Sequence, residues 1–523
     1  MLVSKKHKKL VLNLREPDRV LGVIPSAKAI TYKGRTLVAV PHKEDEVRGL
    51  RNIGIDAPAP MAHYYDWPGR YTPFAHQKIT AEFMSMNPRS FCLNGMGSGK
   101  TMSVLWAYDY LRKLKTVRKM LVISPLSTLE RTWGDEIFRN MTGYSFAVVH
   151  GAAEKRVKLL ESDEFDIYII NHDGLKSSQT MAALSKRTDI DVVVVDEIAS
   201  FRNASTDRWR ALNSYINGNE KKGVRAIPIV WGLTGTPTPN EPIDAWAQIR
   251  LISPGRVPKF LGHFRDTVMR QVTQFKWVAR DNAVQAVSEV MQPAIRFATE
   301  DCIDLPPTTY ITRQVDMTPE QKKAFKEMMS NLQADVAAGQ ITAVNEAVKL
   351  GKITQILAGV AYDKDGNTVS IPAGPRIELV KEIIEEAGAK VIVFVPFTGA
   401  LDMLADALRK DYTVEVVHGG TSKPERDRIF SEFQNTKRPH VLVANAGAMS
   451  HGLTLTASDT IIWYAPTTSN ETYLQANARI VRPGQKRTTR IVQIESTDIE
   501  RKMYERLASK GKMQGLLLDL VRG

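Results

Sequence analysis

Residues 94–101 read Asn-Gly-Met-Gly-Ser-Gly-Lys-Thr, and these residue types at this spacing can bind a phosphate chain. Glycines let backbone N–H groups curl around an anion, and a helix that begins after the loop adds partial positive charge. Lys100 is expected to reach the β- and γ-phosphates of ATP, and Thr101 to ligate Mg²⁺ through its hydroxyl. The strict motif has glycine where this chain has Asn94, so the match is to a looser form. The expected phosphate-binding residues are Gly97, Ser98, Gly99, Lys100 and Thr101.

A pair of carboxylates follows another apolar run. Asp196 and Glu197 come directly after residues 191–195, which read Asp-Val-Val-Val-Val. A carboxylate at the carboxyl end of a buried strand lies where open α/β sheets bind their ligands. Asp196 is expected to hold Mg²⁺, and Glu197 to orient and deprotonate an attacking water. An Asp-Glu pair after a strand is also a common helix start, but together with the phosphate loop it indicates ATP hydrolysis.

The elements that must position these residues are short, continuous apolar runs. Such runs, separated by helical stretches, are typical of a buried parallel sheet with helices on both faces. The runs of the first part are at 91–93, 120–123, 167–170, 192–195 and 227–233. After residue 375 strands are expected at 391–395, 414–417, 440–444, 460–464 and 490–493, and helices at 399–409, 423–433 and 470–480. The sequence therefore predicts an α/β fold with two parallel-sheet lobes.

The chain of 523 residues is too long for one hydrophobic core, and four regions are expected. Residues 1–65 form a small basic α+β accessory domain, with strands at 20–24 and 36–40 and a helix at 44–51. A proline-containing linker runs from 56 to 73. The first lobe covers 66–255, a helix-rich inter-lobe region with a turn near 363–367 covers 256–374, and the second lobe with a C-terminal helix covers 375–523.

Composition bears on the partner and the compartment. Lys and Arg exceed Asp and Glu by 71 − 57 = 14, and the pI is near 9.5, which suits a polyanion such as nucleic acid. Two cysteines, Cys92 and Cys302, are too few for a disulfide framework and fit a reducing cytoplasm. The N-terminal lysines are not followed by the apolar run of a signal peptide. The stretch 441–458 has no Asp, Glu, Lys or Arg but is interrupted by Gly, Ser, Thr and Asn, so no membrane span is expected.

Two further strings point to a family. Residues 233–237 read Leu-Thr-Gly-Thr-Pro, and residues 475–485 read Gln-Ala-Asn-Ala-Arg-Ile-Val-Arg-Pro-Gly-Gln. With the phosphate loop and the Asp-Glu pair, in this order, the chain resembles helicase superfamily two and, within it, the Swi/Snf-like family of DNA translocases. The resemblance covers residues from about 70 to 500 and implies two RecA-like lobes, ATP hydrolysis and a compact bacterial or phage-type member. Ile198 and Ala199 stand where the family usually has alanine and histidine.

The resemblance also implies roles at the nucleotide. Gln77 matches the glutamine that reads the adenine edge. Gly452 belongs to the fifth motif, 452–455, in which the family often has asparagine in place of Thr454. Arg479 and Arg482 match an arginine pair that reaches the γ-phosphate from the second lobe and stabilises charge in the transition state. Their spacing of three places both on one face of a helix or its last turn.

The same resemblance implies the partner. It indicates double-stranded DNA bound through its phosphate backbone, without base readout and with a strong dependence on salt. The chain is expected to act as a monomer in the cytoplasm of a bacterium or a phage-infected cell. The expected nucleic-acid contacts are Ser124, Pro125, Trp133, Thr236, His418, Thr421 and Thr454.

Three other functions are compatible with parts of the sequence. A strand-separating helicase on DNA or RNA needs a wedge element, and no β-hairpin for one is recognisable. A motor subunit of a restriction complex calls for a partner and usually a nuclease motif, and no convincing carboxylate-plus-lysine nuclease site is present. A non-catalytic DNA-binding scaffold would have a degraded phosphate loop, Asp-Glu pair or arginine pair, whereas all three are intact.

Overall fold

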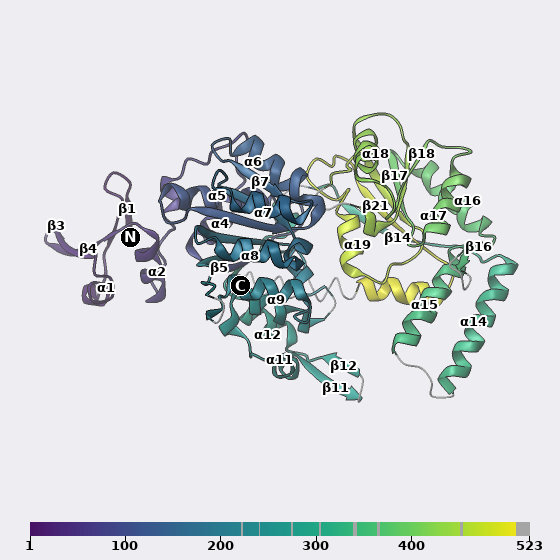
Figure 1. Cartoon of the computed structure of the whole chain (residues 1–523), viewed down its shortest axis with the longest axis horizontal. Helices are drawn as coiled ribbons and strands as arrows, with labels where there is room; N and C mark the ends of the chain where they lie inside the picture. The colour runs from purple at the N-terminus through teal and green to yellow at the C-terminus, as the bar shows by residue number, and fades with distance from the viewer. Residues whose placement is uncertain are drawn as a thin grey trace. The chain divides into compact units, whose positions relative to one another are not determined.

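The structure, a computed structural model, describes residues 1–220, 223–239, 241–273, 276–302, 305–337, 343–362, 367–449 and 453–508 (Figure 1). Of these residues, Met1–Ala298 form one compact unit, and those from Thr299 onward form a second. The division falls inside the stretch 256–374, which the sequence predicts to be a single inter-lobe region. No described helix has both the length and the apolar character needed to cross a membrane.

The first unit is built on a seven-stranded sheet in which every pair of neighbours is parallel. The strand order is β13-β5-β10-β9-β6-β8-β7. The strands are β5 (Arg89–Cys92), β6 (Lys119–Ser124), β7 (Phe146–Val149), β8 (Ile167–Asn171), β9 (Ile190–Asp196), β10 (Ile229–Leu233) and β13 (Ala294–Ile295).

Both faces of this sheet are buried. Side chains alternate between the two faces along a strand, and on each face they pack into an apolar cluster. In β9, Val193 and Val195 belong to one apolar cluster, and Val192 and Val194 belong to another. The first cluster includes residues of α7 (Ala153–Glu161), α8 (Ser178–Lys186), α9 (Asp207–Ile216) and α10 (Ala245–Ile252). The second includes residues of α4 (Ala75–Met86), α5 (Lys100–Lys113) and α6 (Asp135–Asn140).

The second unit contains a six-stranded parallel sheet in the order β14-β21-β20-β17-β19-β18. Its strands are β14 (Thr308–Gln314), β17 (Lys390–Phe394), β18 (Val414–Val417), β19 (Val441–Ala444), β20 (Ser458–Trp463) and β21 (Thr489–Glu495). One apolar cluster includes α16 (Gly374–Glu386) and α17 (Thr398–Leu408), and the other includes α18 (Lys423–Asn435) and α19 (Asn470–Asn477). Residues 498–508 after the last strand are helical. The predicted α/β fold with two RecA-like parallel-sheet lobes is thus confirmed.

The N-terminal domain is a four-stranded antiparallel sheet with two helices. The strand order is β1-β2-β4-β3, and the elements are β1 (Leu2–Ser4), β2 (Lys9–Leu12), α1 (Pro17–Val23), β3 (Lys28–Tyr32), β4 (Arg35–Pro41) and α2 (Glu44–Asn52). The strand predicted at 20–24 is wrong. Pro17 and Asp18 stand in the first helical turn, and Val20 and Ile24, four residues apart, pack on the same core. The expected linker after α2 contains α3 (Met61–Tyr64).

The stretch between the lobes divides between the two units. The first receives α11 (Leu261–Val268), α12 (Ala283–Val290) and a hairpin of β11 (Met269–Thr273) and β12 (Lys276–Ala279), which projects beyond these helices (Figure 1). The second receives α13 (Thr299–Cys302), α14 (Pro319–Ala337), α15 (Ala343–Leu357), β15 (Val360–Tyr362) and β16 (Thr368–Ser370). Strand β13 holds residues 294–295 in the first unit, because Phe91 N and Leu93 N donate to the carbonyls of Pro293 and Ile295. Most of the turn expected near 363–367 lies outside the described residues.

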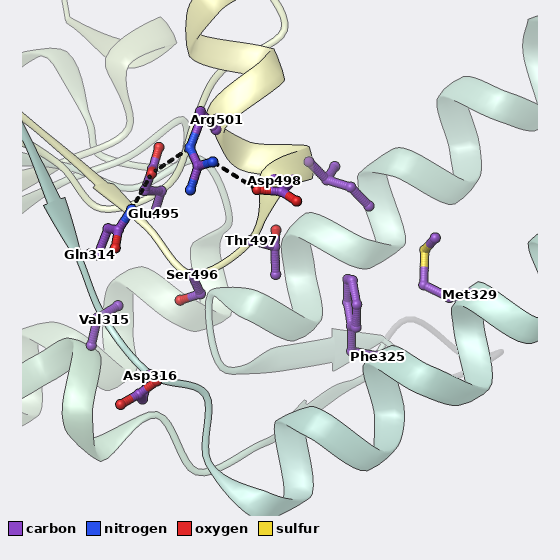
Figure 2. Close-up of a pocket in the computed structure, with 11 residues that line it drawn as sticks. Gln314, Val315, Asp316, Phe325, Met329, Glu495, Ser496, Thr497, Asp498 and Arg501 are labelled. Carbon is purple, nitrogen blue, oxygen red and sulfur yellow. Dashed lines mark hydrogen bonds and ion pairs between the residues drawn. The ribbon is translucent and has the colours of Figure 1, made fainter.

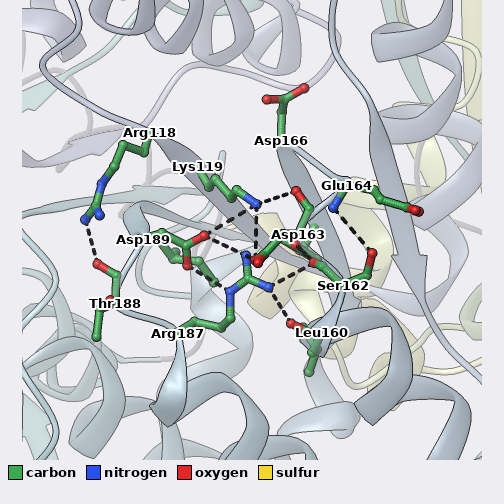
Figure 3. Close-up of polar contacts among 12 residues, drawn as sticks. Arg118, Lys119, Leu160, Ser162, Asp163, Glu164, Asp166, Arg187, Thr188 and Asp189 are labelled. Atoms are coloured by element: carbon green, nitrogen blue, oxygen red, sulfur yellow. Dashed lines mark hydrogen bonds and ion pairs between the residues drawn. The ribbon is translucent and has the colours of Figure 1, made fainter.

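An ion network lies at the amino ends of strands in the first sheet (Figure 3). Arg187 donates to both carboxylate oxygens of Asp189, at 2.8 and 2.6 Å, and to the carbonyls of Leu160 and Ser162. Its guanidinium also lies 5.0 Å from the centre of the Tyr168 ring. The network joins the segments before β8 and β9, at the edge opposite the one that carries the sequence motifs.

Candidate active site

The motif residues of the first unit gather at the carboxyl edge of its sheet. Strands β5, β10, β9 and β6 are consecutive neighbours, and all are parallel. The loop to Lys100 follows β5, Thr234 follows β10, Asp196 ends β9 and Ser124 ends β6. Residues far apart in sequence therefore meet at one edge, which is where open parallel sheets bind ligands.

The loop between β5 and α5 has the backbone of a phosphate cradle. Gly97 and Gly99 have φ angles of +76° and +77°, a region that favours glycine. A Cβ at Gly99 would lie 2.0 Å from Nε2 of Gln77, so a larger residue does not fit against that side chain. The first N–H groups of α5 have no acceptor within the helix and are available to an anion.

The side chain of Asn94 explains why asparagine stands where the strict motif has glycine. Its amide donates to Thr80 Oγ1 at 2.8 Å, and its Oδ1 accepts from the N–H of Phe297 at 2.9 Å. Asn94 is buried, and these bonds tie the loop to α4 and to the segment after β13. The departure from the motif therefore supplies an anchor for the loop.

The polar groups of the loop fit a triphosphate. The Lys100 ammonium donates to the carbonyls of Asn94 and Gly95, at 3.0 and 3.1 Å, on the loop itself. The hydroxyl of Ser98 is buried and has no hydrogen-bond partner among the described residues, so it can bond to a ligand. Thr101 stands, half-buried, in the first turn of α5 beside this loop.

Asp196 is fixed by three groups. Its Oδ2 accepts from the indole N–H of Trp133 at 2.9 Å, and its Oδ1 accepts from the backbone N–H of Glu197 at 3.0 Å. His172 Nε2 lies 2.8 Å from its backbone carbonyl oxygen. Burial raises the pKa of Asp196, and the Trp133 N–H and the positive charge of Lys100 act in the opposite direction. A bound cation favours the ionised form of a carboxylate, so this group is suited to a divalent metal ion.

Glu197 has an unusual backbone. Its φ is +50° and its ψ is +51°, the left-handed region that a non-glycine residue adopts uncommonly. Such backbones persist where the surrounding structure fixes them, and they cluster at functional sites. The Glu197 carbonyl accepts from the N–H and the hydroxyl of Ser200, which holds this turn in place.

Gln77 lies against the phosphate loop. Its Oε1 accepts from the N–H of Phe74 at 3.0 Å, and its Nε2 donates to the Ser98 carbonyl at 3.4 Å. His76, which the sequence does not predict as a site residue, lies closer, with Nε2 2.8 Å from the same carbonyl. Both side chains are buried and brace the loop from α4. The only signal for His76 in the sequence is its place next to Gln77.

In the second unit, the two arginines converge. Arg479 and Arg482 follow the end of α19, and a guanidinium nitrogen of each donates to the carbonyl of Leu453. The backbone carbonyl of Arg479 also accepts from Leu455 N at 3.0 Å. Arg479 and Arg482 thus form one cluster with the fifth motif, 452–455, although Gly452 of that motif lies outside the described residues.

Further motif residues lie at the carboxyl edge of the same sheet. The loop after β18 is closed by a 3.0 Å bond from His418 N to Thr421 Oγ1, and both residues are half-buried. Arg426 donates to the carbonyls of Thr421 and Ala448, so it joins this loop to the segment after β19. Thr454, of the fifth motif, is exposed.

Three of the expected nucleic-acid contacts are buried in this structure. The side chains of Ser124, Trp133 and Thr236 are at most 4% exposed. Trp133 packs in a core of the first sheet and directs its N–H at Asp196. The hydroxyls of Ser124 and Thr236 have no partner among the described residues, but they are enclosed and do not reach the surface. Pro125 is half-buried at the surface.

A pocket of about 640 Å³ in the second unit is separate from the motif residues (Figure 2). It lies between the ends of β14 and β21 and the side of α14. Arg501 donates to Glu495 at 3.0 Å and pairs with Asp498 at 2.9 Å, and Gln314 donates to the same Glu495. These polar groups of the pocket therefore bind one another.

The comparisons with known proteins identify the family. Residues 76–361 match the SNF2-related domain, and residues 375–484 match the helicase conserved C-terminal domain. The first match alone spans more than half of the chain. The chain belongs to the SNF2-related family of helicase-like, ATP-dependent proteins, and its enzyme class is ATP hydrolase.

Individual relatives are distant. A protein of Acyrthosiphon pisum secondary endosymbiont phage 1, named p41, is 24% identical over 86% of this chain and 99% of its own length. The ISWI chromatin-remodeling complex ATPase ISW1 of Saccharomyces cerevisiae is 24% identical over 81% of this chain and 38% of its own length. The chain spans about a third to a half of the length of the other curated relatives that it matches. The solved Sulfolobus solfataricus SWI2/SNF2 ATPase core in complex with dsDNA has 22% identity and a TM-score of 0.41, and the match covers 86% of this chain and 94% of that one.

Proposed function

We propose that this chain is a nucleic-acid-dependent ATPase motor that translocates on or remodels double-stranded DNA. The observation that carries the proposal is the meeting of Lys100, Asp196 and Glu197 at one edge of a parallel sheet, in a chain of the SNF2-related family. The net charge of +14 supports a polyanionic track. A relative named as a chromatin-remodeling ATPase supports DNA as that track.

The chemistry follows from the side chains of the first unit. Lys100 and the loop amides bind the phosphates of ATP. The oxygen of a water attacks the γ-phosphorus, the bond to the β-phosphate oxygen breaks, and the water proton passes to Glu197. Asp196 and Thr101 would hold Mg²⁺, which draws negative charge from the phosphoryl oxygens. Gln77 is proposed to read the adenine edge.

In this proposal, the second unit supplies positive charge to the reacting phosphoryl group and contacts to the nucleic acid. Arg479 and Arg482 stabilise the charge that develops on the transferred phosphoryl group. Gly452 contributes to the nucleotide site. The nucleic-acid backbone is bound without base readout, so binding weakens as salt rises. The residues proposed to contact it are Pro125, His418, Thr421 and Thr454.

An ATPase assay tests the proposal. Turnover is measured without nucleic acid and with saturating duplex DNA, single-stranded DNA or RNA of equal length. Duplex DNA should stimulate wild-type turnover most, and Lys100→Ala should have no turnover but retain DNA binding, because Lys100 acts on the nucleotide. Equal or greater stimulation by RNA would overturn the choice of track, and turnover by Lys100→Ala would overturn the assignment of the loop.

The hairpin β11–β12 favours one alternative function, a strand-separating helicase. Such an enzyme needs a wedge, and the hairpin projects with Val272 53% exposed. The deciding measurement is ATP-dependent release of a labelled strand from a duplex with a single-stranded overhang. Release of the strand would favour the helicase, whereas ATP turnover without release would favour translocation on intact duplex.

A further inference from the structure

The N-terminal domain holds half of the net charge of the chain. Residues 1–41 contain nine Lys or Arg and two Asp or Glu, a net charge of 9 − 2 = +7, against +14 for all 523 residues. All nine basic residues are exposed, and none of them forms an ion pair with a described Asp or Glu. Positive charge that is concentrated and not neutralised by the protein is available to an anionic partner.

Both helices of this domain cover the same face of its sheet. The buried side chains of β2 and β4 are Leu10, Leu12, Val38 and Val40, and they form one core with Val20, Ile24, Val47 and Leu50 of the helical segments. Figure 1 shows α1 and α2 on one side of β3 and β4. The opposite face of the sheet is therefore not covered by either helix.

Strand alternation and register define what that uncovered face presents. Side chains alternate between faces along a strand, and paired residues of neighbouring strands point to the same face. The pairs that fall opposite the core are Leu2↔Val11 and Ser4↔Lys9 on β1 and β2, Lys9↔Pro41 and Val11↔Ala39 on β2 and β4, and Lys28↔Ala39, Ile30↔Leu37 and Tyr32↔Arg35 on β3 and β4. We call Leu2, Lys9, Lys28, Ile30, Tyr32 and Arg35 the open face.

The open face combines cations with exposed apolar groups. Leu2 is 64% exposed, Ile30 38% and Tyr32 60%. Tyr32 is paired with Arg35 across the strands, and the ammonium of Lys33 lies 5.6 Å from the centre of its ring. An aromatic ring beside several cations on a sheet is a combination that binds a nucleic-acid strand, with phosphates on the cations and a base or sugar on the ring.

The turn next to Tyr32 adds a further cation. Lys33 has a φ of +50° and Gly34 a φ of +74°, so the two-residue turn between β3 and β4 has two left-handed positions. Asn, Asp or Gly normally fill the first of these positions, because a longer side chain is disfavoured there. A lysine in this position adds its charge to the edge of the open face.

We propose that the open face binds the phosphodiester backbone of nucleic acid and gives the motor a nucleic-acid-binding surface in addition to those of its two lobes. This inference rests on the proposed function, since the partner is the track of the same enzyme. The cations hold phosphates, so the contact carries no base information. Tyr32 packs on a base if the strand is single and on the backbone if it is duplex.

A charge-removal variant of the full chain tests the inference. The open-face variant combines Lys9→Gln, Lys28→Gln and Arg35→Gln. The matched control combines Lys186→Gln, Lys410→Gln and Lys437→Gln, which removes three exposed charges elsewhere. Equilibrium binding to labelled duplex and single-stranded DNA is measured across a range of salt for both variants and the wild type, together with thermal unfolding.

The open-face variant should bind at least one DNA form about tenfold or more weakly, because it loses three phosphate contacts. The slope of log K against log salt should fall by about 2.7 for duplex or about 2.1 for a single strand. ATP turnover at saturating DNA should stay near the wild-type rate, since the catalytic groups are unchanged. The control should keep both its affinity and its salt slope.

Tyr32 distinguishes the two DNA forms. If a base stacks on the ring, Tyr32→Ala should weaken single-strand binding several-fold, whereas Tyr32→Phe should bind like the wild type. A loss confined to duplex in the charge variant would instead assign the face to duplex backbone.

Two outcomes separate this inference from the proposed function. Unchanged affinity and salt slope in the open-face variant for both DNA forms, in a protein whose ATPase is still stimulated by DNA, would overturn the inference alone. Absence of any DNA stimulation in the wild type would contradict the proposed function.

Discussion

At the residue scale, the carboxylate of Asp196 depends on side chains far from it in sequence. The Trp133 N–H donates to one of its oxygens, and the charge of Lys100 acts on the same group. His172 lies 2.8 Å from the Asp196 carbonyl. We therefore propose Trp133 as a positioning residue for the proposed metal ligand, a role that its motif alone does not distinguish from a nucleic-acid contact.

Replacement of Trp133 by phenylalanine tests that assignment. The change removes the N–H while keeping an aromatic ring, and a hydrogen bond to a charged group contributes about 1.5–3 kcal/mol. The Mg²⁺ concentration for half-maximal ATP turnover should rise by about tenfold or more, because Asp196 is held less firmly. The matched control is Trp231→Phe, which removes an indole N–H bond to the Asn87 carbonyl in the same core. An equal rise in both variants would show a general loss of stability instead.

Glu197 supports a second prediction. Glu197→Gln keeps the size and hydrogen bonding of the side chain, but the amide cannot accept a proton from water. Turnover should fall by about 10²–10⁴-fold, with ATP affinity retained. Single-turnover hydrolysis and equilibrium nucleotide binding measure the two effects separately. If Glu197→Gln instead lost ATP affinity while the bound ATP was hydrolysed at the wild-type rate, the role of Glu197 as general base would be contradicted.

At the element scale, a buried ion pair joins α16 to the segment after β21. Arg376 is 2% exposed and Glu500 0%, with two bonds of 2.9 and 2.8 Å between them. Arg376 also donates to Ser496 Oγ at 2.7 Å and to the Tyr464 carbonyl. Loss of one partner would leave the other charge buried without compensation, so the pair constrains how these elements pack.

Glu500→Gln should therefore lower the free energy of unfolding by about 3–5 kcal/mol. The double variant Arg376→Met, Glu500→Leu should be less destabilised, because no buried charge remains. Arg409→Ala, which breaks the exposed pair with Asp406, should change stability by about 1 kcal/mol or less. Denaturant unfolding followed by circular dichroism measures all three. A Glu500→Gln protein as stable as the wild type would contradict the role of the pair.

The strands that carry the motifs are predictable because they are runs of β-branched and aliphatic residues buried on both faces. The valines of β9 and the run 391–395 are examples. Strand β14 is not predicted, because it lies at the edge of its sheet and its mostly exposed residues form no apolar run. The hairpin β11–β12 has no Asn-Gly or Asp-Gly turn to mark it. Contacts such as Trp133 to Asp196 depend on tertiary packing and have no local signal.

At the scale of the whole molecule, the proposed reaction uses groups from two compact units. The phosphate loop, Asp196 and Glu197 belong to the first, and Arg479 and Arg482 belong to the second. Within the second unit both arginines bond to the Leu453 carbonyl, so the cluster is formed by that unit itself. In the proposed mechanism, duplex DNA stimulates hydrolysis through a step that needs both sets of groups.

The two-unit mechanism is tested most directly by single-turnover ATP hydrolysis, with and without duplex DNA, in the wild type, Arg479→Ala and Arg482→Ala. Duplex DNA should accelerate the wild type. Each variant should lose that acceleration and fall by about 10³-fold or more, with ATP affinity within several-fold of normal. Lysine should restore little activity at either position, because a point charge lacks the planar fork of the guanidinium. If both alanine variants keep the full DNA-stimulated rate, the arginines take no part in the reaction and the two-unit mechanism is contradicted.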